Sequence, residues 1–148
     1  MTVTGLKLHA LNLLQRRVIT MPLDISAIKD FHAHVYFEPA VTEDAAARLR
    51  ARVAEAFPAA LLGRWHAQPI GPHTSAMYQI AFPIELFPTL VPWLMLNREG
   101  LDVLLHPETG DDPADHTKHA AWLGEKLPLR MEAFADVQQR PLKACYAP

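Results

Sequence analysis

Two histidines at strand spacing have the clearest chemical potential in this sequence. His32 and His34 stand two residues apart in the alternating stretch Phe31–Phe37. Residues i and i+2 of a β-strand point to the same face, about 6–7 Å apart, so two imidazole rings can converge on one ion. Neutral imidazole is the commonest metal ligand at physiological pH. The spacing therefore favours a metal site, although exposed strand faces also carry such pairs without a ligand.

The elements that must position these histidines follow from the periodicity of apolar residues. We expect helices over 42–57 and 85–98, and strands over 31–37, 64–69, 75–82 and 101–106. This β-α-β-β-α-β order is typical of an α+β ferredoxin-like sandwich, in which a four-stranded antiparallel sheet carries both helices on one face. Another open α/β sandwich and a small barrel are the alternatives.

The end of the chain adds smaller elements to this plan. Asp112 or Asp115 could cap a short third helix that ends near Gly124, and an edge strand is expected over 127–134. The sheet face away from the helices would then be open. Because an uncovered face is exposed to solvent, we expect a homodimer that pairs the two open faces.

Alternation within the first strand places its histidines on that open face. The apolar residues should meet the helices, so His32, His34 and Tyr36 point away from them. In the strand order 4-1-3-2, the fourth strand brings His106 towards the same pair, whereas His73 should lie near the far end of the first strand. Three histidines that leave coordination positions open are suited to a catalytic metal.

A carboxylate could complete such a site. Glu38, which follows the first strand, is the best candidate, and Asp102 on the fourth strand is the next. Neither clearly joins the three histidines in the predicted register, so an all-histidine site is the first hypothesis. A one-residue slip in register would move His106 to the other face.

Composition limits the classes of protein that remain. The chain has 148 residues, the length of one domain, and half of them are apolar. The formal net charge of −2 argues against nucleic-acid binding, and no apolar run is long enough to span a membrane. Cys145 is the single cysteine, so no intramolecular disulfide forms and a cytoplasmic location is expected. We expect an N-terminal extension over 1–27 and one domain over 28–148.

Three separated blocks resemble the DOPA 4,5-dioxygenase family. They are Phe31–Phe37, then Gly71-Pro72-His73 with Met77-Tyr78-Gln79, then Leu104–Asp112 with Asp115-His116 and Trp122-Leu123-Gly124. The resemblance covers roughly residues 28–130. It implies extradiol cleavage of a small catechol such as L-DOPA by O₂ and a non-haem Fe(II) ion, with zinc or manganese as ions that the isolated protein could also hold.

The activity implied by this resemblance suggests a role for each candidate residue. The hypothesis assigns metal binding to His32, His34 and His106, with His73 as an alternative to His32. His73 or His116 would transfer the catechol proton, and Tyr36 would assist catalysis by a hydrogen bond to a substrate oxygen. Substrate binding is assigned to Tyr78, Arg64 and Gln79. Three alternatives use the same scaffold. They are another metal-dependent enzyme such as a zinc hydrolase or isomerase, a non-enzymatic dimer that binds a small aromatic molecule, and a cofactor-free monooxygenase.

Overall fold

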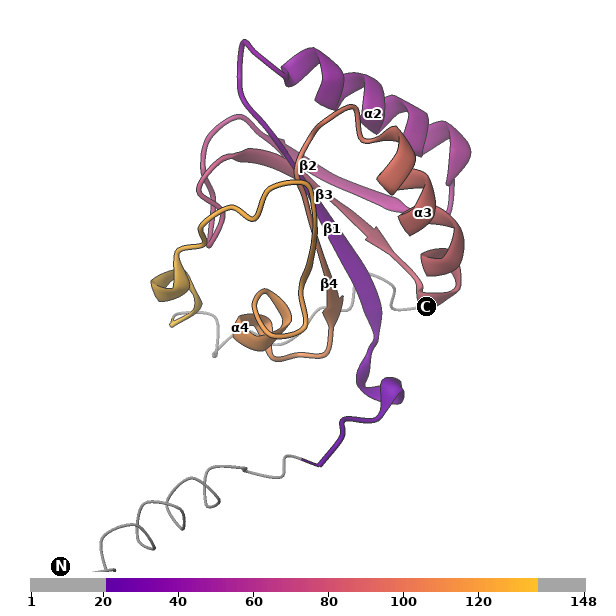
Figure 1. Cartoon of the computed structure of the whole chain (residues 1–148), viewed down its shortest axis with the longest axis vertical. Helices are drawn as coiled ribbons and strands as arrows, with labels where there is room; N and C mark the ends of the chain where they lie inside the picture. Colours follow the sequence, from indigo (N-terminus) through magenta and orange to yellow (C-terminus); the bar gives the residue numbers. More distant parts are fainter. Residues whose placement is uncertain (1–20, 136–148) are drawn as a thin grey trace, which may run out of the picture.

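A five-stranded antiparallel sheet organises residues 21–135, the part of the chain that this computed structural model describes (Figure 1). The spatial order is β2-β3-β1-β4-β5. The strands are β1 (Asp30–Phe37), β2 (Leu61–His66), β3 (Ala76–Phe82), β4 (Val103–Glu108) and β5 (Ala121–Leu123). The predicted α+β class and the order of the first four strands are confirmed. Most of the expected N-terminal extension, residues 1–20, lies outside the described residues.

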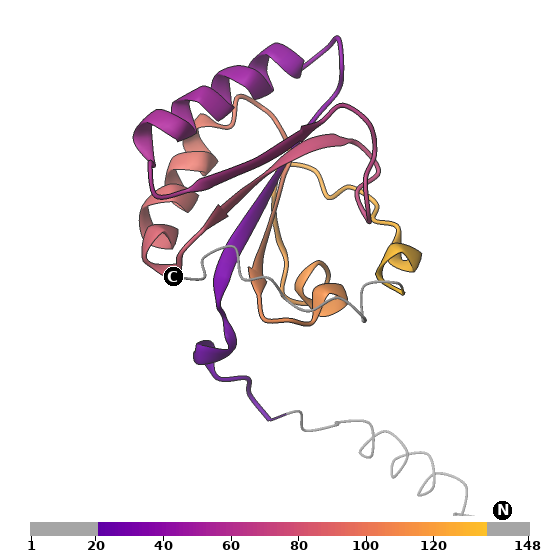
Figure 2. The ribbon, with the colours of Figure 1, turned by 180° about the vertical axis from the view of Figure 1, so that it is seen from behind.

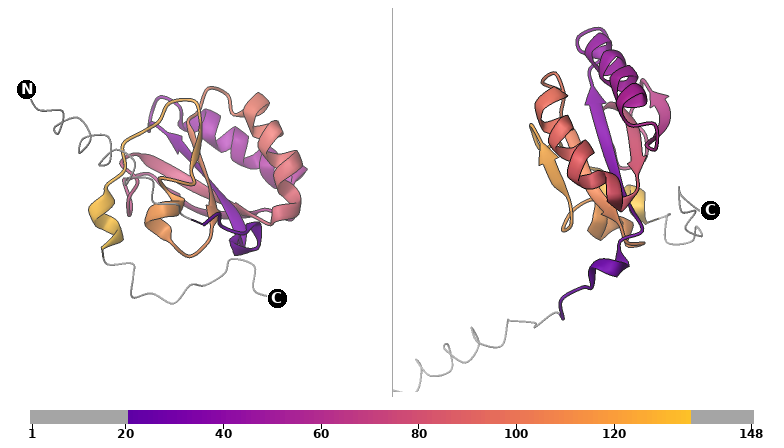
Figure 3. Two further views of the ribbon diagram at one scale, coloured as in Figure 1. Left: turned by 60° about the horizontal axis from the view of Figure 1, so that its bottom comes forward. Right: turned by 90° about the vertical axis from the view of Figure 1, so that its right-hand side faces the viewer.

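Two helices cover one face of the sheet. These are α2 (Glu43–Ala56) and α3 (Phe87–Asn97), which lie side by side in every view (Figures 1, 2 and 3). The short α4 (Asp112–Asp115) lies on the other side of the sheet (Figure 1). Three 3₁₀ turns complete the described structure: η1 (Ile25–Ala27), η2 (Ile84–Leu86) and η3 (Met131–Phe134).

Helix α2 shows why this face is stable. Its residues Ala46, Leu49 and Val53 are fully buried at spacings of three and four, so one stripe of the helix packs on the sheet. The predicted capping residue Thr42 does hold the N-cap position. However, its hydroxyl accepts the Glu38 N–H at 2.8 Å, and so fixes the turn between β1 and the helix rather than the helix end itself.

The pairing of β1 with β4 gives the register that the histidines need. His32 lies opposite His106, and Ala33 opposite Leu105. The apolar β1 residues belong to the core beneath α2 and α3, as predicted, whereas Tyr36 packs in a separate cluster on the other face.

Pro107 was expected to end the fourth strand, but it pairs with Phe31 inside β4. The Asp102 carbonyl accepts the Tyr36 N–H, and the Glu108 carbonyl accepts the Lys29 N–H. The backbone N–H and C=O groups of the even-numbered β4 residues therefore point towards β1. The backbone nitrogen of Pro107, which has no hydrogen to donate, therefore points away from β1. On that side β5 pairs only with residues 103–105, so Pro107 has no β5 partner there. A proline is tolerated at such an unpaired position.

The predicted third helix and edge strand are wrong in their placement. Helix α4 ends at Asp115, and residues 121–123 form the fifth strand instead. Over 127–134, Pro128 lacks the donor that a strand requires, and the only β-type pair in the described part of that segment is an isolated bridge between Leu129 and His73.

This C-terminal segment covers the sheet face that was expected to be open. Trp122 stacks on Tyr36 with ring centroids 5.7 Å apart, and Leu127 and Leu129 pack on the same cluster. Figure 2 shows the segment crossing this side of the sheet. The argument for a homodimer from an uncovered face therefore fails, and the dimer stays a prediction. Within residues 21–135, no helix has the length and apolar character needed to cross a membrane.

Substitution of a core leucine should separate packing from helix propensity. Leu49→Ala empties a fully buried position and should lower the free energy of unfolding by about 2–5 kcal/mol. Leu96→Ala, on α3 and 87% exposed, is the matched control and should change it by less than about 0.5 kcal/mol. Urea denaturation measures both. Equal effects would contradict the assignment of the core.

Candidate metal centre

Five imidazole rings gather on the sheet face opposite α2 and α3. His32 and His34 come from β1, His106 from β4, His73 from the loop before β3, and His116 from the end of α4. The ring centroid of His34 lies 4.3 Å from that of His73 and 5.1 Å from that of His106, and the His106 and His116 centroids lie 4.0 Å apart. The three predicted metal residues and the two predicted proton-transfer residues, His73 and His116, thus form one cluster.

His34 belongs to two overlapping groups of potential ligands. In the first, nitrogens of His32, His34 and His106 all lie within 4.8 Å of one another. In the second, nitrogens of His34, His73 and His116 meet the same criterion. The first group contains the three residues that the sequence analysis named as ligands. The second was not foreseen as a ligand set, because His116 depends on where α4 returns to the sheet.

Hydrogen bonds to backbone carbonyls fix two of the rings. His106 Nδ1 donates to the Pro107 carbonyl at 2.8 Å, and His116 Nδ1 donates to the Asp112 carbonyl at 2.9 Å. Since each neutral ring carries one proton, the Nε2 atoms of both residues retain free lone pairs. Metal-binding histidines are commonly oriented by such bonds through their other nitrogen.

The environment of His34 fits an ion at the centre of the cluster. Because His106 Nε2 carries a lone pair, His34 Nε2 donates to it at 3.0 Å, and the lone pair of His34 is on Nδ1. Its Nδ1 is buried and has no hydrogen-bond partner among the described residues. An unpaired buried nitrogen is costly, and neutral imidazole nitrogens are a donor set suited to iron or zinc. The residues present therefore fit a metal ion.

Burial keeps these rings neutral. Loss of solvent, followed by the neighbouring imidazoles, lowers the pKa of His32 to about 4, of His73 to about 3 and of His106 to about 2. Burial likewise places the pKa of His34 well below its ordinary value. The cluster thus offers uncharged ligand atoms at neutral pH. Protonation of any of these rings would destabilise the folded protein.

A buried carboxylate holds α4 in place. Asp115 is fully buried and accepts the Thr109 N–H and hydroxyl, each at 2.8 Å, and His119 Nδ1 at 3.0 Å. Asp111 caps the helix by accepting the Ala114 N–H. Because His116 follows Asp115 directly, the three bonds to the Asp115 carboxylate set the position of its ring.

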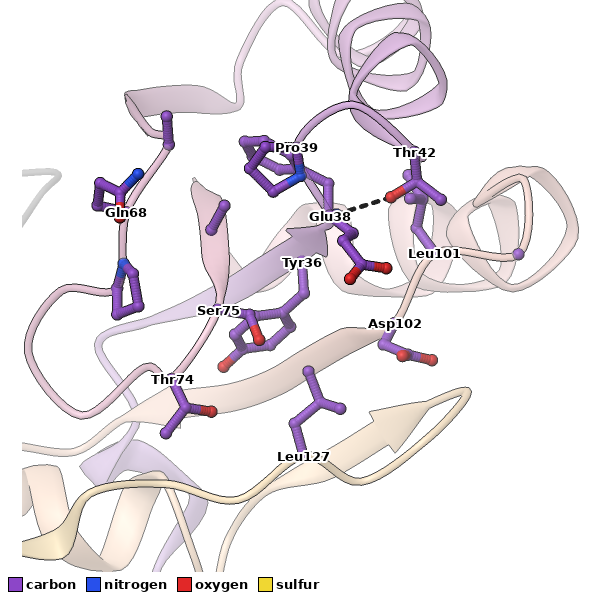
Figure 4. Close-up of a pocket in the computed structure, with 15 residues that line it drawn as sticks. Tyr36, Glu38, Pro39, Thr42, Gln68, Thr74, Ser75, Leu101, Asp102 and Leu127 are labelled. Carbon is purple, nitrogen blue, oxygen red and sulfur yellow. Dashed lines mark hydrogen bonds between the residues drawn. The ribbon is translucent and has the colours of Figure 1, made fainter.

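The carboxylates proposed from sequence lie away from the histidines. Glu38 and Asp102 line a pocket of about 510 Å³ at the other end of β1, with Tyr36 as part of its wall (Figure 4). Asp102 Oδ1 accepts the Glu125 N–H there at 2.7 Å. Neither is placed to complete a site with His32 and His34.

Two other carboxylates approach the cluster. Asp30 Oδ1 lies 3.5 Å from His32 Nε2, and Glu108 Oε2 lies 3.9 Å from His32 Nδ1. Burial, followed by the charges of nearby aspartates, raises the pKa of Glu108 to about 7. Sequence reasoning missed both residues. The available signal was alternation, since Asp30 and Glu108 stand two positions from His32 and His106 respectively.

The structure separates the three predicted substrate residues. Arg64 and Gln79 line a pocket of about 310 Å³ that His34 and His73 also line. Tyr78 instead lies on the helix side of β3, where it is fully buried and stacks on Trp65 with centroids 5.5 Å apart. Adjacent strand residues point to opposite faces, so Tyr78 cannot share the pocket with Gln79.

Removal of the Asp115 carboxylate should loosen the histidine cluster. Asp115→Ala leaves the Thr109 and His119 donors unpaired, so we expect about 1–3 kcal/mol less stability and 10–100-fold weaker zinc binding. A chelator competition titration measures the affinity. Asp111→Ala, which removes only the cap of α4, is the control and should retain the parent affinity. Parent-like affinity in Asp115→Ala would exclude this positioning role.

The metal-free protein should lose stability on mild acidification. Between pH 7 and 5 the unfolded chain protonates its histidines near their ordinary pKa, whereas the buried rings stay neutral. Each such ring contributes a slope of up to about 1.4 kcal/mol per pH unit, favouring the folded state as pH rises. Glu108 and Asp30, whose pKa values are raised by burial, oppose the trend. Urea unfolding in chelator measures the net slope, and constant or rising stability towards pH 5 would contradict it.

Comparison with known proteins shows which proteins this chain is related to. The model of the Dopa 4,5-dioxygenase family matches residues 31–133. An uncharacterized 21.2 kDa protein of Botryotinia fuckeliana is 36% identical over 131 residues, which cover 82% of this chain and 72% of that protein. A DOPA 4,5-dioxygenase of Amanita muscaria is 37% identical over 113 residues, which cover 72% of this chain and 50% of that enzyme.

A solved structure agrees with these matches. The crystal structure of a candidate dioxygenase from Nostoc punctiforme shares 50% identity and a TM-score of 0.75, covering 78% of this chain and 99% of its own. The family match spans both strands that carry the histidines, as well as His73 and His116. The chain therefore belongs to the Dopa 4,5-dioxygenase family.

Proposed function

We propose that this protein is a non-haem, metal-dependent extradiol dioxygenase that cleaves the ring of a catechol such as L-DOPA with O₂. The observation that carries the proposal is the cluster of five neutral, inward-facing imidazoles beside a pocket. Family membership and the name of the Amanita relative support the choice of substrate. The strand order β2-β3-β1-β4, with α2 and α3 on one face, supports a ferredoxin-like scaffold.

His32, His34 and His106 would hold the ion, which we take to be Fe(II), although zinc or manganese could replace it in the isolated protein. A ferrous ion with open positions would bind the two catechol oxygens and activate O₂. His106 is oriented for this role by its bond to the Pro107 carbonyl. The carboxyl groups of Asp30 and Glu108 lie near His32, and burial raises the pKa of both, so a cation at the site would favour their ionised forms.

His73 is the proton acceptor in this proposal. It lines the pocket beside His34, is neutral at pH 7, and has Nδ1 2.7 Å from the Tyr36 hydroxyl. With the Nδ1 hydrogen donated to the Tyr36 oxygen, the lone pair of His73 is on Nε2 and would accept the proton of a catechol hydroxyl. Because burial lowers its pKa to about 3, His73 is a weak base before substrate binds, and a proton that it accepts would be readily returned later in the reaction. His116 is the second candidate for this role, and Gln79 would bind a substrate oxygen from the pocket wall.

Ring cleavage tests the proposed reaction directly. Fe(II)-loaded protein is mixed without oxygen with L-DOPA and a panel of catechols, and air is then admitted. We expect oxygen uptake and a yellow product, both lost in His34→Ala and unchanged in Arg48→Gln, a substitution of an exposed α2 residue paired with Glu99.

Two outcomes would overturn this proposal in different ways. Bound metal without a product from any catechol would favour another metal-dependent reaction, such as a zinc hydrolase or isomerase. Failure to bind metal would instead favour a non-enzymatic protein that binds small aromatic molecules. Cytoplasmic location and homodimer formation stay predictions.

Single substitutions distinguish the two possible ligand sets. If the first group holds the ion, His32→Ala should weaken Fe(II) binding at least about 100-fold, since a direct ligand contributes more than its supporting neighbours. His116→Ala should then weaken it by only about 10–100-fold, the effect of removing a supporting residue. Metal titration of both variants measures this difference, and the reverse ranking would assign the ion to His34, His73 and His116.

A further inference from the structure

A β-bulge in β2 turns Arg64 towards the histidine side of the sheet. Leu62 pairs with Ile80 and Trp65 pairs with Tyr78, so Gly63 and Arg64 together oppose Gln79. Both Leu62 and Trp65 pack against the helix-side core. With regular alternation from Leu62, Arg64 would share their face. The extra residue changes this and places its side chain in the wall of the pocket.

Among the described residues, one permanent charge, the Arg64 guanidinium, lines this pocket, and no aspartate or glutamate belongs to its wall. Within residues 21–135, the Arg64 guanidinium has no hydrogen bond or ion pair. Nearby, Arg130 donates to the carbonyls of Gly71 and His73. An anionic group entering the pocket would therefore meet an available guanidinium.

Strand spacing sets the distance between this cation and the metal candidates. Gln79 lies opposite His34 on one side and opposite the Gly63–Arg64 bulge on the other. Two strand spacings, about 10 Å, thus separate the backbones of His34 and Arg64. That separation matches the length of a catechol with a short acidic side chain, bound with its two hydroxyls at the histidines and its carboxylate at Arg64. Gly63 adds no side chain between them.

We propose that this pocket selects catechols that carry a carboxylate but no ammonium group, with Arg64 as the residue that determines the selection. The inference rests on the proposed function for the orientation of the ring. Arg64 binds the carboxylate in a paired, charge-assisted hydrogen bond. An α-ammonium group would lose water on entry and find no carboxylate on the pocket wall, so its desolvation would not be offset. L-DOPA would then be a poorer ligand than its deaminated analogue.

Calorimetric binding to zinc-loaded protein under nitrogen tests this selection without turnover. The ligands share one ring: 3-(3,4-dihydroxyphenyl)propanoate, L-DOPA, dopamine and 4-ethylcatechol. We expect the propanoate to bind about 10–100-fold more tightly than 4-ethylcatechol, as charged hydrogen bonds of ordinary strength imply. L-DOPA should bind more weakly than the propanoate, and dopamine more weakly than 4-ethylcatechol.

Variants connect the selection to Arg64. Arg64→Gln should remove the advantage of the propanoate and leave 4-ethylcatechol unchanged, whereas Arg64→Lys should retain part of the advantage. Arg48→Gln, in α2 on the other face of the sheet, is the matched control and should behave as the parent protein. Circular dichroism checks that every variant is folded.

Several results would overturn the inference. The inference fails if the propanoate and 4-ethylcatechol bind equally, if L-DOPA is preferred, or if no ligand binds. It also fails if Arg64→Gln lowers the affinity for the propanoate and for 4-ethylcatechol by the same factor. Selective binding without ring cleavage by Fe(II)-loaded protein in air would uphold the pocket and reject the dioxygenase. Ring cleavage without selection would uphold the dioxygenase and reject the role of Arg64.

Discussion

The burial of five uncharged imidazoles against one face of a β-sheet is the constraint on which the rest of this structure depends. A sheet face can be left to water, but here the segment after β4 covers it and removes solvent from the rings. Desolvation disfavours protonation, so the nitrogens keep their lone pairs. The same covering that makes the rings good ligands makes an unpaired nitrogen costly, and a bound metal ion would remove that cost.

The two faces of the sheet have separate tasks. Beneath α2 and α3, aliphatic and aromatic residues supply the packing that stabilises the fold. On the other face, backbone carbonyls orient His106 and His116, and the Asp115 network anchors α4. The bulge in β2 adds Arg64 to the same side at two strand spacings from His34. A rigid sheet thus defines both the distance and the direction between the candidate metal ligands and the candidate substrate anchor.

Local alternation predicted the part of the site that depends on a single strand. It placed His32, His34 and Tyr36 on one face, and the strand order brought His106 to them. It failed where the position depends on tertiary contacts. The shortness of α4, the approach of His116 and the bulge at Arg64 follow from packing and pairing with distant residues. Tyr78 was a different error, because alternation with Gln79 already excludes a shared face.

Anomalous diffraction at the iron edge, from crystals loaded with Fe(II) without oxygen, tests the central claim most directly. The claim is that the histidine cluster is a metal centre. It predicts one dominant peak within bonding distance, about 2.0–2.2 Å by analogy with zinc sites, of imidazole nitrogens that include one from His34. A dominant peak elsewhere on the protein, or no peak among the five rings, would contradict the account.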